Sequence, residues 1–114
     1  MSQDCIFCKI LDGDIPAELI YEDDDIVAFN DISPQAPTHI LVIPRKHITG
    51  PVALTDTDEL LMGKLVKVGV DLAKSMGLDD GFRFVMNNGE RAGQTVFHLH
   101  MHVLGGRELT WPPG

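Results

Sequence analysis

The chain has 114 residues and a formal net charge of −8, with 44% hydrophobic and 23% charged residues. This composition is typical of a single globular domain with its own core, and no apolar run approaches the roughly 20 residues needed to span a bilayer. The acidic balance argues against general nucleic-acid binding, and it means that a phosphate-bearing ligand must be held by local hydrogen-bond donors.

The two cysteines, Cys5 and Cys8, lie close to the N-terminus. The residues around them lack the basic and apolar segments of a secretory signal, so the expected location is cytoplasmic. In a reducing compartment the spacing C-x-x-C indicates either a metal site or a redox pair. A redox pair would follow a strand in a βαβ pattern, and no strand precedes Cys5. Metal binding is therefore favoured, provided that further ligands exist.

The first half of the chain predicts one short helix and three strands, over residues 5–11, 18–22, 26–29 and 39–44. The helix presents Phe7, Ile10 and Leu11 on one side. The first two strands are joined by an acidic turn and form a predicted hairpin. Residues 30–37 form a loop, because prolines and an Asp/Ser cluster interrupt regular structure. Both faces of the third strand are apolar, which indicates a central position in the sheet.

The second half predicts a long helix over residues 56–76 and strands over residues 82–87 and 97–104. Asp56 is the expected N-cap of the helix, with Glu59 at the capping-box spacing. A core-facing stripe comprises Leu61, Leu65, Val68, Leu72 and Met76. The tail, residues 105–114, is expected to be irregular. The element order predicts one α+β domain over residues 1–114, an antiparallel sheet with its helices on one face.

Three histidines, His98, His100 and His102, alternate with apolar residues in the last strand. On a strand this spacing places all three imidazoles on one face and the apolar residues on the other, facing the core. A His-rich solvated face is the plain alternative reading. The outer two histidines would be about 13 Å apart on a strand, so the three are expected to divide their tasks.

Two mechanisms remain open on these residues alone. In the first, neutral His100 attacks phosphorus and forms a covalent intermediate, while His102 donates to a phosphoryl oxygen. In the second, the three histidines line a metal ion that activates water. The turn Gly93-Gln94-Thr95 offers backbone N–H groups and a hydroxyl to a phosphate, which favours the first mechanism, although it could equally be a simple chain reversal.

The run His98-Leu99-His100-Met101-His102-Val103-Leu104 resembles the signature of the histidine-triad (HIT) superfamily, in which histidines alternate with apolar residues. The ending Trp111-Pro112-Pro113-Gly114, the segment 28–34 and the segment 38–44 resemble its HINT branch, the histidine-triad nucleotide-binding proteins. The resemblance covers about residues 5 to 114.

The resemblance implies a HIT-like fold, a five-stranded antiparallel sheet with one short and one long helix. It also implies a homodimer whose two sheets join into ten strands, with the tail contributing to the active site. The implied activity is hydrolysis of the P–N bond of purine nucleoside phosphoramidates, which releases AMP or GMP through a nucleotidyl-histidine intermediate. A membrane or nucleic-acid partner is not implied.

The resemblance also implies roles for individual residues. His100 is the nucleophile, His102 and Gly93-Gln94-Thr95 hold the α-phosphate with Asn87 beside it, and His39 supports the triad. Asp31 binds the ribose hydroxyls, and Trp111 reaches the substrate pocket of the partner subunit. The base is held by Phe7, Ile10, Phe29, Ile32 and Leu41. For these five residues the plain alternative is core packing.

In family members that keep C-x-x-C, a histidine after the long strand and the first triad histidine complete a zinc site. By that resemblance the ligands here are Cys5, Cys8, His47 and His98. Two cysteines and two histidines form a closed tetrahedral zinc set, which has a structural role. The expected cofactor is therefore a structural Zn²⁺ that takes no part in the chemistry.

Two other functions are kept as alternatives. One is hydrolysis of dinucleoside polyphosphates, the activity of a related branch, although the WPPG ending favours the phosphoramidate. The other is a nucleotide-binding regulatory protein that acts through contacts with other proteins. The amine leaving group and the preference between adenine and guanine do not follow from the sequence.

Overall fold

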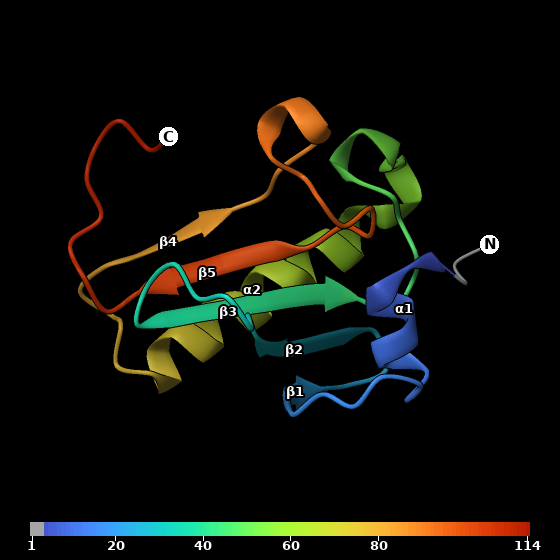
Figure 1. Cartoon of the computed structure of the whole chain (residues 1–114), viewed down its shortest axis with the longest axis horizontal. Coiled ribbons are helices and arrows are strands. Elements are labelled where there is room, and N and C mark those ends of the chain that lie inside the picture. The colour runs from blue at the N-terminus through green and yellow to red at the C-terminus, as the bar shows by residue number, and fades with distance from the viewer. Residues whose placement is uncertain (1–3) are drawn as a thin grey trace.

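The computed structural model describes residues 4–114 as one five-stranded antiparallel sheet with a helix on each face (Figure 1). The strands are β1 (Leu19–Glu22), β2 (Ile26–Asn30), β3 (Thr38–Pro44), β4 (Phe82–Val85) and β5 (Met101–Gly105). The helices are α1 (Ile6–Leu11) and α2 (Glu59–Ser75). Single 3₁₀ turns cover Pro51–Ala53, Asp56–Asp58 and Glu90–Ala92. No helix of the described chain is long and apolar enough to cross a membrane.

The strand order β1-β2-β3-β5-β4 places β3 in the middle of the sheet, which confirms the position predicted from its apolar faces. The predicted hairpin of β1 and β2 is also present. Asp23 closes its turn, because one carboxylate oxygen accepts the backbone N–H groups of Asp25 (2.7 Å) and Ile26 (2.8 Å). The histidine-bearing β5 lies between β3 and β4 and is antiparallel to both.

Each face of the sheet carries its own hydrophobic cluster. The larger cluster lies under α2 and includes Leu65, Val68 and Leu72 of the predicted stripe, whereas Met76 is exposed. The smaller cluster lies under α1 and is built from Phe7 together with residues of β2 and β3. The prediction that both helices cover one face was therefore wrong. β2 and β3 are buried on both faces, and the second face has to be covered by α1.

The long helix begins later than predicted. A 3₁₀ turn occupies residues 56–58, and the capping box is formed by Thr55 and Asp58 instead of Asp56 and Glu59. The Asp58 carboxylate accepts the Thr55 backbone N–H at 2.9 Å and is paired with Lys46 Nζ at 2.6 Å. This ion pair stabilises the carboxylate at position 58, and Asp56 has no equivalent pair.

Gly69 lies where α2 crosses the sheet. A Cβ at this position would come within 2.5 Å of Met101 Cε and 3.1 Å of Phe84 Cζ. Gly69 thus lets α2 approach the sheet of the same chain closely. Gly63 faces open space, with no heavy atom of the described chain within 4 Å of such a Cβ.

Candidate active site and metal centre

The histidine motif straddles the start of β5. The predicted strand over residues 97–104 begins only at Met101, so His98 and His100 precede the ladder. Pro44, at the end of β3, has no N–H to continue the pairing. Instead its carbonyl oxygen accepts the Nε2–H of His98 at 2.8 Å. The predicted two-faced pattern holds nevertheless, because Leu99, Met101 and Val103 are all buried in the cluster under α2.

His100 has one free ring nitrogen. Its Nδ1 lies 2.7 Å from the carbonyl oxygen of His98, which can only accept, so Nδ1 carries the proton. Nε2 of the neutral ring therefore holds a lone pair. The ring is nine-tenths buried and packs edge-on against Phe7 (centroids 5.1 Å apart) and His102 (5.0 Å). The backbone thus fixes the tautomer that a nitrogen nucleophile needs.

A hydrogen-bond relay fixes the tautomer of His102 in the opposite sense. The backbone N–H of Gln35 donates to His39 Nδ1 at 3.0 Å, so the proton of neutral His39 is on Nε2. That Nε2–H points at His102 Nδ1, 2.8 Å away, and leaves the proton of His102 on its own Nε2. Asp31 lies 3.5 Å from His39 Nε2. His102 is thereby set as a hydrogen-bond donor beside the His100 lone pair.

Burial favours the neutral form of His39, His98 and His102. Desolvation, with further repulsion from His100 and His39, lowers the pKa of His102 to about 4. Desolvation also lowers the pKa of His39, against the opposing effect of Asp31, and that of His98. Since both members of the relay must be neutral for the tautomers just described, the low pKa of His102 favours that arrangement near neutral pH.

Acidification should therefore destabilise the fold. Between pH 6.5 and about 4, an unfolded chain protonates its histidines while folded His102 stays neutral, so the free energy of unfolding falls as the pH falls. Allowing for partial exposure, the loss from His102 is about 2 kcal/mol. Urea unfolding of metal-free protein at several pH values measures it, and His102→Asn should flatten the slope. An unchanged stability across this range would contradict the assignment.

Four metal-binding side chains converge between α1 and the ends of β3 and the His98 segment. They are Cys5, Cys8, His47 and His98. The Nδ1 of His98 lies 3.4 Å and 3.5 Å from the two sulfurs and 3.1 Å from the Nδ1 of His47, which is 3.2 Å from Cys8 Sγ. Donors of a tetrahedral zinc site are separated by about 3.3–3.8 Å, given ordinary zinc–ligand distances. The donor set and its spacing fit zinc.

Backbone groups hold the members of this cluster in place. His98 is fully buried and donates its Nε2–H to a backbone carbonyl, which directs the Nδ1 lone pair at the sulfurs. Cys5 caps α1 and accepts the backbone N–H of Cys8 at 3.3 Å. His47 is exposed at the rim. We therefore identify these four residues as a candidate zinc centre.

A metal held by all three histidines of the motif finds no support. Among residues 4–114 two groups have the proximity to bind a metal, the Cys₂His₂ cluster and a group of Asp31, His39 and His102, and neither unites the three. In the second group the ring nitrogens of His39 and His102 are already hydrogen-bonded to each other, with His39 Nε2–H donating to His102 Nδ1 at 2.8 Å. His98 is turned toward the cysteines instead, away from the role that a catalytic metal would require.

An apolar wall lies beside the His100 ring. Phe7, Phe29 and Leu41 are buried in one cluster, and Ile10 packs against it, whereas Ile32 is 98% exposed. The structure therefore brings four of the five expected base-contacting residues together. Asp31 follows β2, and one of its carboxylate oxygens accepts the Ser33 N–H at 2.7 Å.

The loop before the motif is held rigidly by Gln94. Its side chain is 3% exposed, accepts the Gly89 N–H (2.7 Å) and donates to the carbonyls of Thr49 (2.8 Å) and Val96 (3.1 Å). The backbone N–H groups of Gly93 and Gln94 already donate to carbonyls in the same loop. Thr95, in contrast, is exposed. Gln94 thus shapes the loop from inside.

Asn87 lies just beyond the end of β4 that is next to the histidine motif, whereas Trp111 lies in the tail away from it. Val85 faces His102 across the β4–β5 ladder, so Asn87 continues along the chain toward His100. The tail leaves β5 at the end of the sheet away from α1, and its Trp111 is 80% exposed (Figure 1). The structure therefore does not bring Trp111 to the histidines of its own chain.

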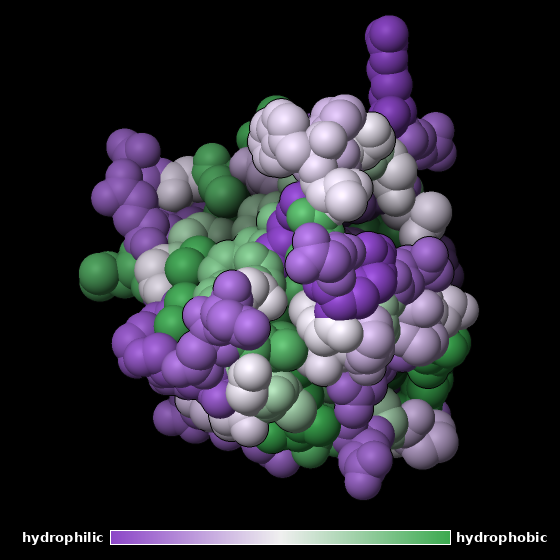
Figure 2. All heavy atoms as spheres, turned by 90° about the vertical axis from the view of Figure 1, so that its left-hand side faces the viewer, coloured by the Kyte–Doolittle hydropathy of each residue, from purple (hydrophilic) through white to green (hydrophobic). Residues whose placement is uncertain are grey.

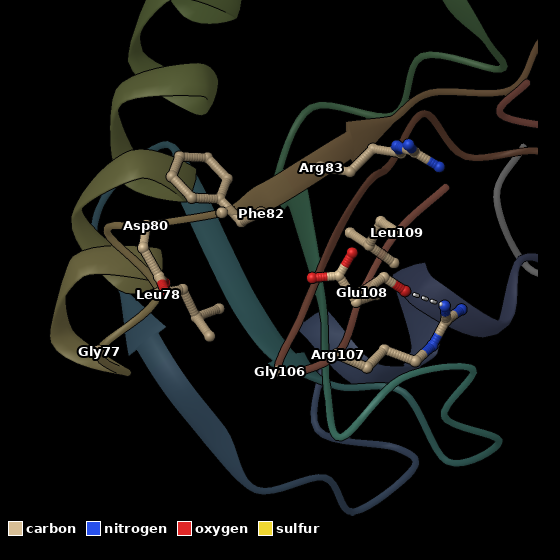
Figure 3. Close-up of a pocket in the computed structure, with 10 residues that line it drawn as sticks. Gly77, Leu78, Asp80, Phe82, Arg83, Gly106, Arg107, Glu108 and Leu109 are labelled. Carbon is tan, nitrogen blue, oxygen red and sulfur yellow. Dashed lines mark hydrogen bonds between the residues drawn. The ribbon is translucent and has the colours of Figure 1, made fainter. Parts of the chain in front are cut away.

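The tail borders a separate pocket of about 610 Å³. This end of the molecule is hollowed and shows hydrophobic side chains among hydrophilic ones (Figure 2). The lining residues are Gly77, Leu78, Asp80, Gly81, Phe82, Arg83, Gly106, Arg107, Glu108 and Leu109. Arg107 donates to the Glu108 carbonyl (Figure 3) and Arg83 to that of Thr110. The lining includes no histidine, and we place the candidate site at the motif.

The fold and the site define an α+β protein whose histidine motif runs into β5, an inner strand of one antiparallel sheet. The family model of the HIT domain matches residues 12–109. An uncharacterized HIT-like protein of Synechocystis sp. is 50% identical over the full length of both chains. The chain belongs to the HIT domain family.

Solved structures agree with this assignment. A HIT family hydrolase from Legionella pneumophila has a TM-score of 0.94 and 49% identity, covering 96% of this chain and 99% of that one. A histidine triad protein from Clostridium difficile has a TM-score of 0.90 and 45% identity, covering 95% of each chain. The domain match begins after Cys5 and Cys8, so it does not bear on these two residues of the metal centre.

Proposed function

We propose that this protein hydrolyses the P–N bond of purine nucleoside phosphoramidates, as a member of the HINT branch. The observation that carries the proposal is the opposite tautomers of two adjacent imidazoles. His100 is locked with a free Nε2 lone pair, and His102 is locked as an Nε2–H donor. A nucleophile beside a donor is what attack on a phosphoryl group requires. The name of the similar Legionella protein, a HIT family hydrolase, supports the same class of reaction.

The reaction proceeds in two displacements. His100 Nε2 attacks phosphorus, the P–N bond breaks, and the amine leaves with the bonding electron pair and a proton from water. His102 Nε2–H donates to a phosphoryl oxygen during this step. Water then attacks the nucleotidyl-His100, the histidine–phosphorus bond breaks, and the nucleotide leaves. The proton that this attacking water gives up replaces the one that the amine took from water in the first step. The net change is one water consumed per AMP or GMP and amine formed.

The rest of the nucleotide is held by the surrounding residues. The Thr95 hydroxyl, at the mouth of the loop shaped by Gln94, is the proposed phosphate ligand from that loop, with Asn87 beside it. The Asp31 carboxylate accepts from the ribose hydroxyls. The purine lies against the apolar wall formed by Phe7, Ile10, Phe29 and Leu41. The exposed Ile32 closes over the base.

The Cys₂His₂ cluster binds a structural zinc ion in this proposal. When bound, the ion supplies a crosslink between α1, the residues after β3 and the His98 segment, without polarising the substrate. His98 is therefore a metal ligand, whereas His100 and His102 carry the chemistry.

We also propose a homodimer in which β4 of one copy pairs with β4 of the other to form a ten-stranded sheet. β4 is an edge strand, and an unpaired edge invites pairing. On the adjacent helix α2, Leu60 is 91% exposed, Val66 is 41% exposed, and Gly63 faces open space. In the dimer the exposed Trp111 reaches the partner's pocket. Light scattering of the eluting protein should give twice the chain mass, and a monomer would contradict this.

Turnover of two substrates tests the proposed function. An adenosine phosphoramidate should be hydrolysed with a kcat/KM at least about 100-fold above that of a diadenosine polyphosphate. Alkaline quenching during turnover should trap AMP on the peptide that carries His100, because the phosphorus–nitrogen linkage survives alkali. Faster turnover of the polyphosphate would favour the related hydrolase branch. Absence of both activities with tight AMP binding would favour a regulatory nucleotide-binding protein.

A further inference from the structure

Helix α1 faces two sites at once. Cys5 and Cys8 point to the candidate zinc centre, where each sulfur lies within 3.5 Å of His98 Nδ1. Phe7, between them in the sequence, points to the proposed nucleotide pocket. Its ring is 94% buried and packs edge-on against His100 at a centroid distance of 5.1 Å and against Phe29 at 5.5 Å.

A second path joins the same two sites through the backbone. His98 contributes Nδ1 to the metal cluster, and its carbonyl oxygen accepts the Nδ1–H of His100 at 2.7 Å. The edge of the Phe7 ring also contacts His98, at 5.9 Å between centroids. A change in the orientation of His98 would therefore alter both the hydrogen bond that fixes the tautomer of His100 and the packing of its ring against Phe7.

The helix that links the sites has little stability of its own. α1 has six residues, at most half of the roughly 12–15 that an isolated helix needs to be even marginally stable. Its position depends on the two cysteine contacts and on the packing of Phe7 against β2 and β3. Metal ligation fixes the helix on one side, and a purine would fix it on the other.

We infer that metal occupancy and nucleotide binding strengthen each other, and that Phe7 is the positioning residue that transmits this coupling to His100. The inference rests on the proposed function, because it takes a purine nucleotide as the ligand of the pocket. Coupling between two binding equilibria is reciprocal, so each ligand must raise the affinity for the other by the same factor. A zinc ion that acted independently of the nucleotide pocket would change neither affinity.

The test measures both affinities on the full chain. AMP binding is titrated calorimetrically with zinc-loaded and metal-stripped protein, after circular dichroism has shown that both are folded. Zinc affinity is measured by competition with a chromogenic chelator, with and without saturating AMP, and AMP with chelator alone serves as the blank. We expect an increase of about tenfold in each affinity, within the usual range of allosteric coupling. If the stripped protein does not fold, AMP raises the zinc affinity through folding alone, and the difference between the wild type and Phe7→Leu in the zinc competition decides.

Two variants separate positioning from stability. Phe7→Leu keeps an apolar side chain at the site but removes the ring that contacts His100, and it should reduce the coupling factor to below about twofold while zinc still binds. Phe82→Leu is the matched control. It makes the same change in the cluster on the opposite face, under α2, and should leave the coupling factor as in the wild type.

Four results would overturn the inference. Equal AMP affinity with and without zinc removes the coupling and leaves the proposed function intact. Undiminished coupling in Phe7→Leu removes the assigned role of Phe7. Failure of AMP to bind either form contradicts the proposed function itself, and the coupling with it. Absence of zinc binding at micromolar concentrations likewise excludes the coupling, again without touching the chemistry of His100.

Discussion

His100→Ala is expected to lower the kcat for an adenosine phosphoramidate by about 10⁴-fold or more, since removing a covalent nucleophile leaves only the contribution of binding and electrostatics. The chain offers no substitute, because the neighbouring imidazoles have their ring nitrogens committed. His98 donates from Nε2 to Pro44 and directs Nδ1 to the cysteines, and His102 accepts at Nδ1 from His39. Steady-state kinetics and loss of the trapped nucleotidyl peptide measure the effect.

AMP binding is the control for this variant. The phosphate and ribose contacts proposed for His102, Thr95 and Asp31 remain in His100→Ala, so its AMP affinity should stay within about tenfold of the wild type. His102→Ala should behave differently, because removing one donor to the phosphoryl oxygen costs about 10²–10³-fold in kcat. Equal activity of His100→Ala and wild type would disprove the nucleophilic role.

The different roles of the three histidines depend on several structural features, and only some of these features can be predicted from the sequence. Period-2 alternation places Leu99, Met101 and Val103 in the core, and the structure confirms it because burial of one strand face is a local property. The resemblance supplied the pairing of the cysteines with His47 and His98. Residues that are 39 and 90 positions apart carry no local signal of their contact.

The tautomers could not be predicted, because they depend on backbone groups at sites with no chemical signature. The His39–His102 relay is set by the backbone N–H of Gln35, and any residue except proline supplies such a group. The carbonyl of Pro44 likewise orients His98. Pro44 also explains the late start of β5. The pattern of alternating side chains within residues 97–104 cannot reveal this start, because the residue that stops the pairing lies on the neighbouring strand β3.

The direction of side chains in the loops also could not be predicted from the sequence. Gln94 lies in the expected phosphate-binding turn, yet its side-chain amide is hydrogen-bonded inside the protein to backbone groups of Gly89, Thr49 and Val96. Similarly, the covering of the second sheet face by α1 follows from tertiary packing of β2 and β3, whereas the apolar side of α1 fits either face equally well.

Loss of the metal should cost this protein much of its stability, and His47→Ala is the variant that reveals it. Ligand binding to the folded state contributes about 4 kcal/mol to the free energy of unfolding when free zinc exceeds its Kd about 1,000-fold. For a domain of this size that corresponds to a fall of roughly 10–20 °C in Tm. Urea and thermal unfolding in zinc-buffered solution, with metal content from mass spectrometry, measure the loss.

His47 is the ligand best suited to this test because its side chain is exposed, unlike the buried Cys8 and His98. Truncating it removes a metal ligand and little packing, so in metal-free protein the variant should match the wild type within about 0.5 kcal/mol. The difference between zinc-buffered and metal-free protein therefore isolates the contribution of the ion. An equal loss in both conditions would assign His47 a packing role, and no loss in either would exclude a zinc centre at these four residues.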